Sequence, residues 1–298
     1  MAHQTSLGKI SAAGSTLVPE MATADTPQPT REQAIALLRR GLDKALQMAA
    51  AQYAMPICWI AAEKGRPLLL GNGSAFMMDA GSGPFLVTAQ HVYSEYRAAL
   101  ATRADTVCLL GNLIRFPLER RLIASDPIYD VATFKVTPEE IEGFRRDGKF
   151  VLTGSQQTWP PKPPETERGV FFVGFPGDSR HMCPYRGGGL VEIDWNGYSA
   201  LAIATSISAT GITLLLEHDP EYDVGERATV PPDWALGGCS GAPLLTLVDH
   251  NNVYSWRLGG IIYESGETIV KASRADCLNP DGTLNPYPDP MAYVNRRS

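Results

Sequence analysis

The hydrophobic residues of this chain first recur with a helical period after residue 30. Thr30-Arg31-Glu32-Gln33 has the form of a capping box, in which Thr caps the first turn and Gln caps back three residues later. Apolar side chains then fall on one helical stripe, at Ile35, Leu38, Leu42, Leu46 and Ala49. This pattern predicts an amphipathic helix over 30–52. We expect it to pack across the domain surface, and the alternatives are that it binds a regulatory protein partner or covers a substrate cleft.

Beyond Pro56 the pattern changes to short apolar runs between Gly, Pro and polar residues, as in β-strands. A first set of predicted strands covers 57–61, 68–70, 74–78, 85–88, 106–110, 121–124 and 131–136. A second set covers 170–174, 189–193, 200–206, 213–216, 243–247, 255–263 and 268–272. Gly71-Asn72-Gly73 and Gly81-Ser82-Gly83 are expected as turns within the first set. Each set is large enough for one small β-barrel.

The segments outside these sets complete the predicted domain organisation. Residues 1–29 are rich in Ser, Thr, Ala and Pro without an apolar period, which predicts a disordered leader. Thr158-Trp159-Pro160-Pro161-Lys162-Pro163-Pro164 is too proline-rich for a strand or helix and indicates a stiff spacer. The expected order is a leader at 1–29, a helix at 30–52, a first β-unit at 55–137, a linker at 138–168, a second β-unit at 169–276 and a tail at 277–298.

Composition narrows the possible functions. The chain has 298 residues, 28 Gly and 23 Pro, which suit one large all-β unit or two compact halves. Its net charge of −6 gives no sign of a basic surface that would bind nucleic acid. No apolar run is long enough to span a membrane. The 5 cysteines are scattered without paired spacing, and no secretory leader opens the chain. These features predict a cytoplasmic protein.

Three short motifs carry chemistry, and each adjoins a predicted strand. They are Thr88-Ala89-Gln90-His91, Asp130-Val131-Ala132 and Gly238-Cys239-Ser240-Gly241-Ala242-Pro243. A serine hydroxyl becomes a nucleophile when a base accepts its proton, and an imidazole held by a carboxylate supplies that base. Asp130 is preferred to Asp126 because it directly precedes an apolar strand. His181, His218 and His250 lack the spacing of metal ligands, so no metal or other cofactor is expected.

These three motifs, in the order His, Asp, Ser, resemble those of the trypsin-like (chymotrypsin-fold) serine peptidases, and among them the bacterial, disulfide-free type. The resemblance covers roughly residues 57–275. It implies an all-β fold of two six-stranded antiparallel β-barrels preceded by the N-terminal helix, with the site between the barrels. It further implies a serine endopeptidase with His91, Asp130 and Ser240 as catalytic residues. The amides of Gly238 and Ser240 would form the oxyanion hole, and the partner would be a protein or peptide substrate.

The chain departs from this family at two places. Cys239 stands where secreted relatives have an Asp that binds a newly cleaved N-terminus, so activation by that salt bridge is not expected. Cysteine as nucleophile is a rival, although the register from Gly241 favours Ser240. In the family's substrate pocket the floor position corresponds to Trp234, and the wall resembles Tyr263, Glu264 and Ser265.

Two other functions remain open at this stage. One is a catalytically silent, protease-like binding module that recognises a peptide or a partner protein. The other is an esterase or different acyl hydrolase that shares the chemistry. The favoured interpretation is a regulated serine endopeptidase with few targets.

Overall fold

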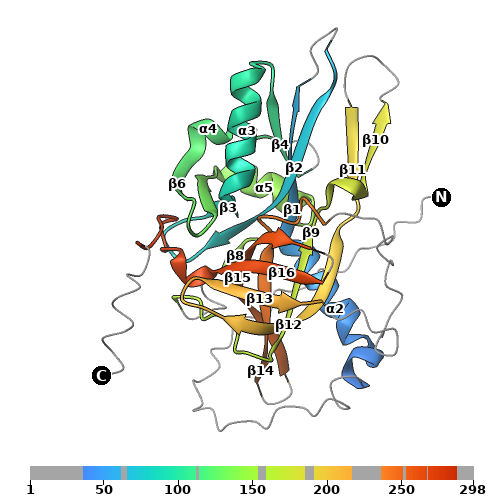
Figure 1. Cartoon of the computed structure of the whole chain (residues 1–298), viewed down its shortest axis with the longest axis vertical. Coiled ribbons are helices and arrows are strands. Elements are labelled where there is room, and N and C mark those ends of the chain that lie inside the picture. Colours follow the sequence, from blue (N-terminus) through green and yellow to red (C-terminus); the bar gives the residue numbers. More distant parts are fainter. Residues whose placement is uncertain are drawn as a thin grey trace, which may run out of the picture.

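The computed structural model describes residues 36–61, 66–111, 114–153, 159–184, 191–216, 236–250, 253–266 and 268–286. The described residues form two β-rich halves that lie against each other (Figure 1). The first half is an eight-stranded sheet that does not close, and the second contains a closed six-stranded barrel. The prediction was an all-β fold of two six-stranded barrels. A mostly β fold is confirmed, whereas closure into a barrel is found only in the second half.

The sheet of the first half has the strand order β5-β4-β1-β2-β3-β7-β6, with β8 pairing to β2. Its strands are β1 (Ala54–Ala61), β2 (Leu69–Asp79), β3 (Phe85–Ala89), β4 (Val107–Leu110), β5 (Ile114–Arg115), β6 (Leu122–Asp126), β7 (Val131–Lys135) and β8 (Leu152–Thr153). Gly71-Asn72-Gly73 lies inside β2, opposite Trp59, Cys58 and Ile57 of β1. The prediction of a turn at this position was therefore wrong.

The first half also contains helices in addition to the N-terminal one, namely α3 (Gln90–Thr102), α4 (Leu118–Arg121) and α5 (Pro138–Arg146). Helix α3 buries Val92, Tyr93, Tyr96 and Ala99 against the sheet, a helical spacing that the prediction of an all-β domain overlooked. Helix α5 begins with a capping box in which Thr137 and Glu140 cap each other. Helix α5 and strand β8 both fall in the segment expected to be a linker.

The barrel of the second half closes in the order β12-β13-β16-β15-β14-β9. Its strands are β9 (Gly169–Gly174), β12 (Tyr198–Ile207), β13 (Gly211–Leu215), β14 (Pro243–His250), β15 (Val253–Ser265) and β16 (Ile269–Arg274). A separate hairpin of β10 (Arg180–Pro184) and β11 (Val191–Trp195) projects beside the β1–β2 hairpin in Figure 1. Short helices η3 (Gly177–Ser179) and η5 (Ala275–Cys277) follow β9 and β16.

The N-terminal helix is described from residue 36 and comprises η1 (Leu38–Leu42) and α2 (Asp43–Tyr53), with a kink at Gly41. Its buried residues Leu46 and Ala50 pack in a core shared by the two halves, with Phe76 of β2 and Phe171 of β9. Each half has a further core of its own. The expected leader at 1–29 and residues 287–298 of the expected tail lie outside the described residues.

Candidate active site

His91 and Asp130 are brought together by the pairing of neighbouring strands. His91 is the second residue of α3, directly after β3, and Asp130 directly precedes β7, which pairs with β3 through Ala89 and Val131. The Nδ1 atom of His91 lies 2.7 Å from Oδ2 of Asp130. The backbone N–H of His91 donates to Oδ1 of the same carboxylate at 2.8 Å. One carboxylate therefore holds both the ring and the backbone of the histidine.

This contact sets the electrostatics of the imidazole. The hydrogen bond that His91 donates to Asp130 raises the pKa of His91 above its ordinary value, partial burial opposes the rise, and the charges of Asp130 and Glu95 add to it. Because Nδ1–H faces the carboxylate, the neutral ring has Nε2 as its proton acceptor. The arrangement suits a general base, because the ring nitrogen that faces away from Asp130 is free to accept a proton.

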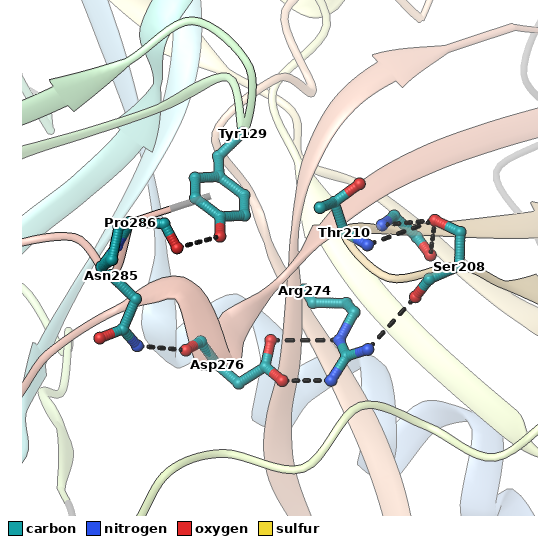
Figure 2. Close-up of polar contacts among 8 residues, drawn as sticks. Tyr129, Ser208, Thr210, Arg274, Asp276, Asn285 and Pro286 are labelled. Carbon is teal, nitrogen blue, oxygen red and sulfur yellow. Dashed lines mark hydrogen bonds and ion pairs between the residues drawn. The ribbon is translucent and has the colours of Figure 1, made fainter. Parts of the chain in front are cut away.

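The loop that carries Asp130 is held from the second half of the protein. Asp130 has a φ of 52°, a left-handed conformation that Asp tolerates better than most residues. The preceding carbonyl, of Tyr129, accepts a hydrogen bond from the buried Ser273 hydroxyl of β16. The Tyr129 hydroxyl donates to the Pro286 carbonyl at 3.3 Å (Figure 2). Asp126, the competing candidate, instead accepts from the backbone N–H groups of residues 128 and 129 as a turn residue.

Figure 2 also shows how the chain after β16 is fastened beside this loop. Arg274 forms an ion pair with Asp276 and donates to the carbonyl of Ser208 at 3.2 Å. The side chain of Asn285 donates to the carbonyl of Asp276 at 2.8 Å. These contacts hold the segment after β16 in place as it passes from the barrel to the first half, where the Pro286 carbonyl binds the Tyr129 hydroxyl.

Ser240 lies in the loop that leads into β14, and its residue surface is 8% exposed. Its hydroxyl donates to the carbonyl of Tyr263 at 3.1 Å, and no hydrogen bond between described residues joins it to His91. The next residue, Gly241, has a φ of 93°, and a Cβ there would lie 3.0 Å from the backbone N of Ala89. Only glycine permits this approach, which places the serine loop next to the strand end that leads to His91.

The backbone before Ser240 forms a type II turn. Cys239 N–H donates to the Leu236 carbonyl at 3.2 Å, and Gly238 has a φ of 106° at the third position of the turn. The Cys239 and Gly241 N–H groups donate within the protein, whereas those of Gly238 and Ser240 have no acceptor among the described residues. Two unpaired donors on either side of Cys239 are the groups that the resemblance assigns to an oxyanion hole.

Cys239 itself is fully buried, and burial raises the pKa of its thiol well above its ordinary value. Its side chain occupies the space in which a Cβ at Gly174 would lie, 2.7 Å from the sulfur. A buried, protonated thiol is a poor nucleophile, so the geometry favours Ser240 over the cysteine.

The expected substrate-pocket residues are placed only in part. Trp234 lies outside the described residues. Tyr263 lies at a register shift between β15 and β16, and burial raises the pKa of its phenol. The carboxylate of Glu264 is exposed and pairs with Lys271 at 2.8 Å, while Ser265 is half-buried and its Oγ has no partner among the described residues. The carboxylate of Glu264 is therefore already paired with the ammonium group of Lys271.

Several polar residues around the serine loop were not anticipated. Ser74 and Asn72 of β2 and the backbone of Gly177 all contact this loop or its neighbours. The sequence analysis places Gly71-Asn72-Gly73 in a turn, and these residues instead lie inside β2. The turn prediction therefore gave no reason to place Asn72 and Ser74 beside the serine loop. Within the described ranges, no group of three or more His, Cys, Asp or Glu side chains is arranged to hold a metal ion.

Fold and site together define a mostly β protein in which an Asp–His pair and a glycine-flanked serine lie on opposite halves. No protein-family model matches the chain, and no curated protein is similar to it. Among solved structures, the active form of the Rv3671c protease from M. tuberculosis is 16% identical with a TM-score of 0.37, over 88% of this chain and 90% of that chain.

A second similar structure comes from work on aromatic interactions in the coupled folding and binding of the disordered Sesbania mosaic virus VPg protein. It is 13% identical with a TM-score of 0.36, over 72% of this chain and 84% of that chain. Likenesses of this strength assign no function to the chain. Of the helices in the described part of the chain, none is long and apolar enough to cross a membrane.

Proposed function

We propose that this protein is a serine endopeptidase that hydrolyses peptide bonds through an acyl-enzyme. The observation that carries the proposal is the carboxylate of Asp130, which holds both Nδ1 and the backbone N–H of His91. An imidazole held in this way has a fixed tautomer and a raised pKa, which are the properties of a general base for a serine.

In the first step, the Ser240 hydroxyl turns from the Tyr263 carbonyl toward His91 and attacks the carbonyl carbon of the substrate. Its proton passes to Nε2 of His91, and Asp130 remains ionised and stabilises the imidazolium. The developing oxyanion accepts hydrogen bonds from the free N–H groups of Gly238 and Ser240. Collapse of the tetrahedral intermediate breaks the C–N bond, and the leaving amine takes the proton from His91.

In the second half-reaction, water attacks the ester on Ser240 with His91 again acting as base. The proton returns to the Ser240 oxygen as the acid product leaves, so no cofactor is required for the proton balance. The buried thiols of Cys58, Cys108, Cys239 and Cys277 are unpaired, which suits a reducing compartment, and we place the enzyme in the cytoplasm.

Labelling with a fluorophosphonate, followed by intact mass, tests this proposal because the probe reports an activated serine without a known substrate. We expect one adduct on the parent, none on Ser240→Ala, and strongly reduced labelling of His91→Ala. Cys239→Ala should retain the adduct. An unlabelled parent with the fold intact would instead support the silent binding module. A labelled parent that hydrolyses simple esters but no peptides would support an esterase.

A further inference from the structure

The loop that carries Ser240 is held from outside by β2 and by the segment that follows β9. The carbonyls of residues 236–240 all accept hydrogen bonds, from Cys239 N–H, Gly177 N–H, the Ser74 hydroxyl, Ala242 N–H and Ser74 N–H, in that order. Three of these five donors come from Ser74 or Gly177, which lie far from the loop in sequence. The two donors of Ser74 come from the first half and that of Gly177 from the second, so the conformation of this loop depends in part on contacts between the two halves.

The contact with Gly177 fixes the direction of one free amide. Gly237 C=O accepts from Gly177 N–H at 2.8 Å, and this carbonyl shares a peptide group with the free N–H of Gly238. Because C=O and N–H of a trans peptide point in opposite directions, anchoring the carbonyl on Gly177 turns the Gly238 N–H to the other side. The same argument applies to Ser240, since the Cys239 carbonyl of its peptide group accepts from Ala242 N–H at 3.0 Å.

Ser74 links the loop to the chain that positions Gly177. Its hydroxyl accepts from Phe175 N–H at 3.0 Å, so its own proton is directed to the Gly238 carbonyl at 2.7 Å. Its backbone N–H donates to the Ser240 carbonyl at 2.8 Å. Ser74 is completely buried, so water does not replace any of these contacts.

Asn72 completes the support two residues earlier on the same strand. Its Nδ2 donates to the Phe175 carbonyl at 2.9 Å, and its Oδ1 accepts from Arg180 at 3.0 Å, which fixes the orientation of the amide. The amide lies directly against Gly238, where a Cβ would overlap Nδ2 and lie 2.6 Å from the Phe175 carbonyl. Asn72 thus supports the turn at Gly238, on the side opposite the free N–H of Gly238.

We propose that Ser74 and Asn72 are positioning residues that hold the Gly238 and Ser240 amides in the oxyanion-binding orientation before substrate arrives. This inference rests on the proposed function. It also explains how the chain dispenses with an acidic residue before the nucleophile: Cys239 packs into the barrel core, and Ser74, Asn72 and Gly177 hold the loop in its place. The enzyme is then competent without cleavage of its own chain.

The test compares Ser74→Ala and Asn72→Ala with Thr106→Val, a control that removes a buried hydroxyl bonded to the Arg103 carbonyl away from the site. We expect the fluorophosphonate rate constant to fall about 10- to 100-fold in Ser74→Ala, since loss of a whole oxyanion donor costs about 100- to 1,000-fold. A fall of about three- to tenfold is expected in Asn72→Ala. The pKa of His91, measured by NMR, should stay at the parent value in both variants.

Crystal structures of the parent and Ser74→Ala separate this proposal from the proposed function. Rotation of the Gly237–Gly238 peptide in Ser74→Ala, with the loop unchanged in Thr106→Val, supports the positioning role even if the parent is never labelled. An unmoved peptide overturns it, and so does a labelling rate of Ser74→Ala equal to that of Thr106→Val when the parent is labelled. If Ser74→Ala does not fold, Asn72→Ala carries the same comparison, because Asn72 is only half-buried.

Discussion

The candidate base and the candidate nucleophile are held in different ways by the two halves of this protein. In the first half, His91 and Asp130 hold each other across adjacent strand ends, with two direct hydrogen bonds. In the second half, Ser240 makes its side-chain hydrogen bond to Tyr263, and its loop depends on donors from β2 and Gly177. The base is thus preformed within the first half, while the nucleophile depends in part on how the two halves meet.

This difference separates two kinds of variant. Changes at Asp130 should affect the imidazole and leave the serine loop in place, because no described hydrogen bond connects Asp130 to that loop. Changes around Gly238 should affect the loop and leave the pKa of His91 unchanged. Four predictions follow from this separation, from the largest expected effect to the smallest.

The largest effect of the four is expected from Asp130→Asn. The amide no longer stabilises the imidazolium and can stabilise the wrong tautomer, and in serine proteases this substitution lowers turnover by about 10⁴-fold. We therefore expect a loss of labelling rate of about that size, with the melting temperature nearly retained. Asp126→Asn, which alters a turn residue, is the matched control for removing a nearby carboxylate. Equal losses in the two variants would assign the effect to the loop and not to the base.

Gly238→Ala should reduce the labelling rate by about 100- to 1,000-fold, the cost of one lost oxyanion donor. The added Cβ would overlap the Asn72 amide, and the φ of 106° is unfavourable for alanine. Gly237→Ala is the matched control, because a Cβ there meets no atom within 4 Å and its φ is not positive. If Gly237→Ala were as damaging as Gly238→Ala, the local contact with Asn72 would not be the cause.

The pH dependence of labelling distinguishes the two halves in one experiment. Since the hydrogen bond to Asp130 raises the pKa of His91, the imidazole stays protonated to a pH above its ordinary pKa of 6.5, and the rate should rise through this higher pH. In Asp130→Asn the acid limb should move to lower pH although the maximum rate falls. In Ser74→Ala it should not move. A shift of the limb in Ser74→Ala would show that the loop and the base are coupled.

The sequence predicts the reactive residues of both halves, but not all of the elements that position them. The His, Asp and Ser motifs were found because each combines a reactive side chain with an adjoining strand. Helix α3 was missed although Val92, Tyr93, Tyr96 and Ala99 have helical spacing, because these residues directly follow a strong strand signal. Asn72 was assigned to a turn because Asn-Gly is common there. Its place inside β2 results from pairing with β1, a long-range contact that local propensity does not encode.

The hydrophobic pattern also does not predict whether the sheet of the first half closes into a barrel. The number of predicted strands suits a barrel, but closure depends on which strands meet at the edges, and β5 and β6 remain the ends of the sheet order. The wall residue Glu264 shows the same limit on a smaller scale. Its carboxylate is paired with Lys271 of the adjacent strand, so residue type alone does not predict whether it is available to a substrate.

The smallest effect is expected at the contact that holds the Asp130 loop to the barrel. Ser273→Ala removes a buried hydroxyl that donates to the Tyr129 carbonyl, and removing one partner of a buried hydrogen bond costs about 1–3 kcal/mol of stability. Asp130 retains both bonds to His91 in this variant, so the labelling rate should fall only a few-fold and the acid limb should stay in place. Denaturant unfolding and labelling of the same sample measure both quantities.

Tyr129→Phe is the comparison for this last prediction, because it removes the 3.3 Å bond to Pro286 from the same residue and leaves the carbonyl contact intact. A longer bond at the edge of the site should contribute no more than about 0.5–1.5 kcal/mol. If Ser273→Ala lost as much rate as Asp130→Asn, the base would depend on the docking of the two halves as strongly as the serine does. The contrast between a self-contained base and a nucleophile held across the junction would then be wrong.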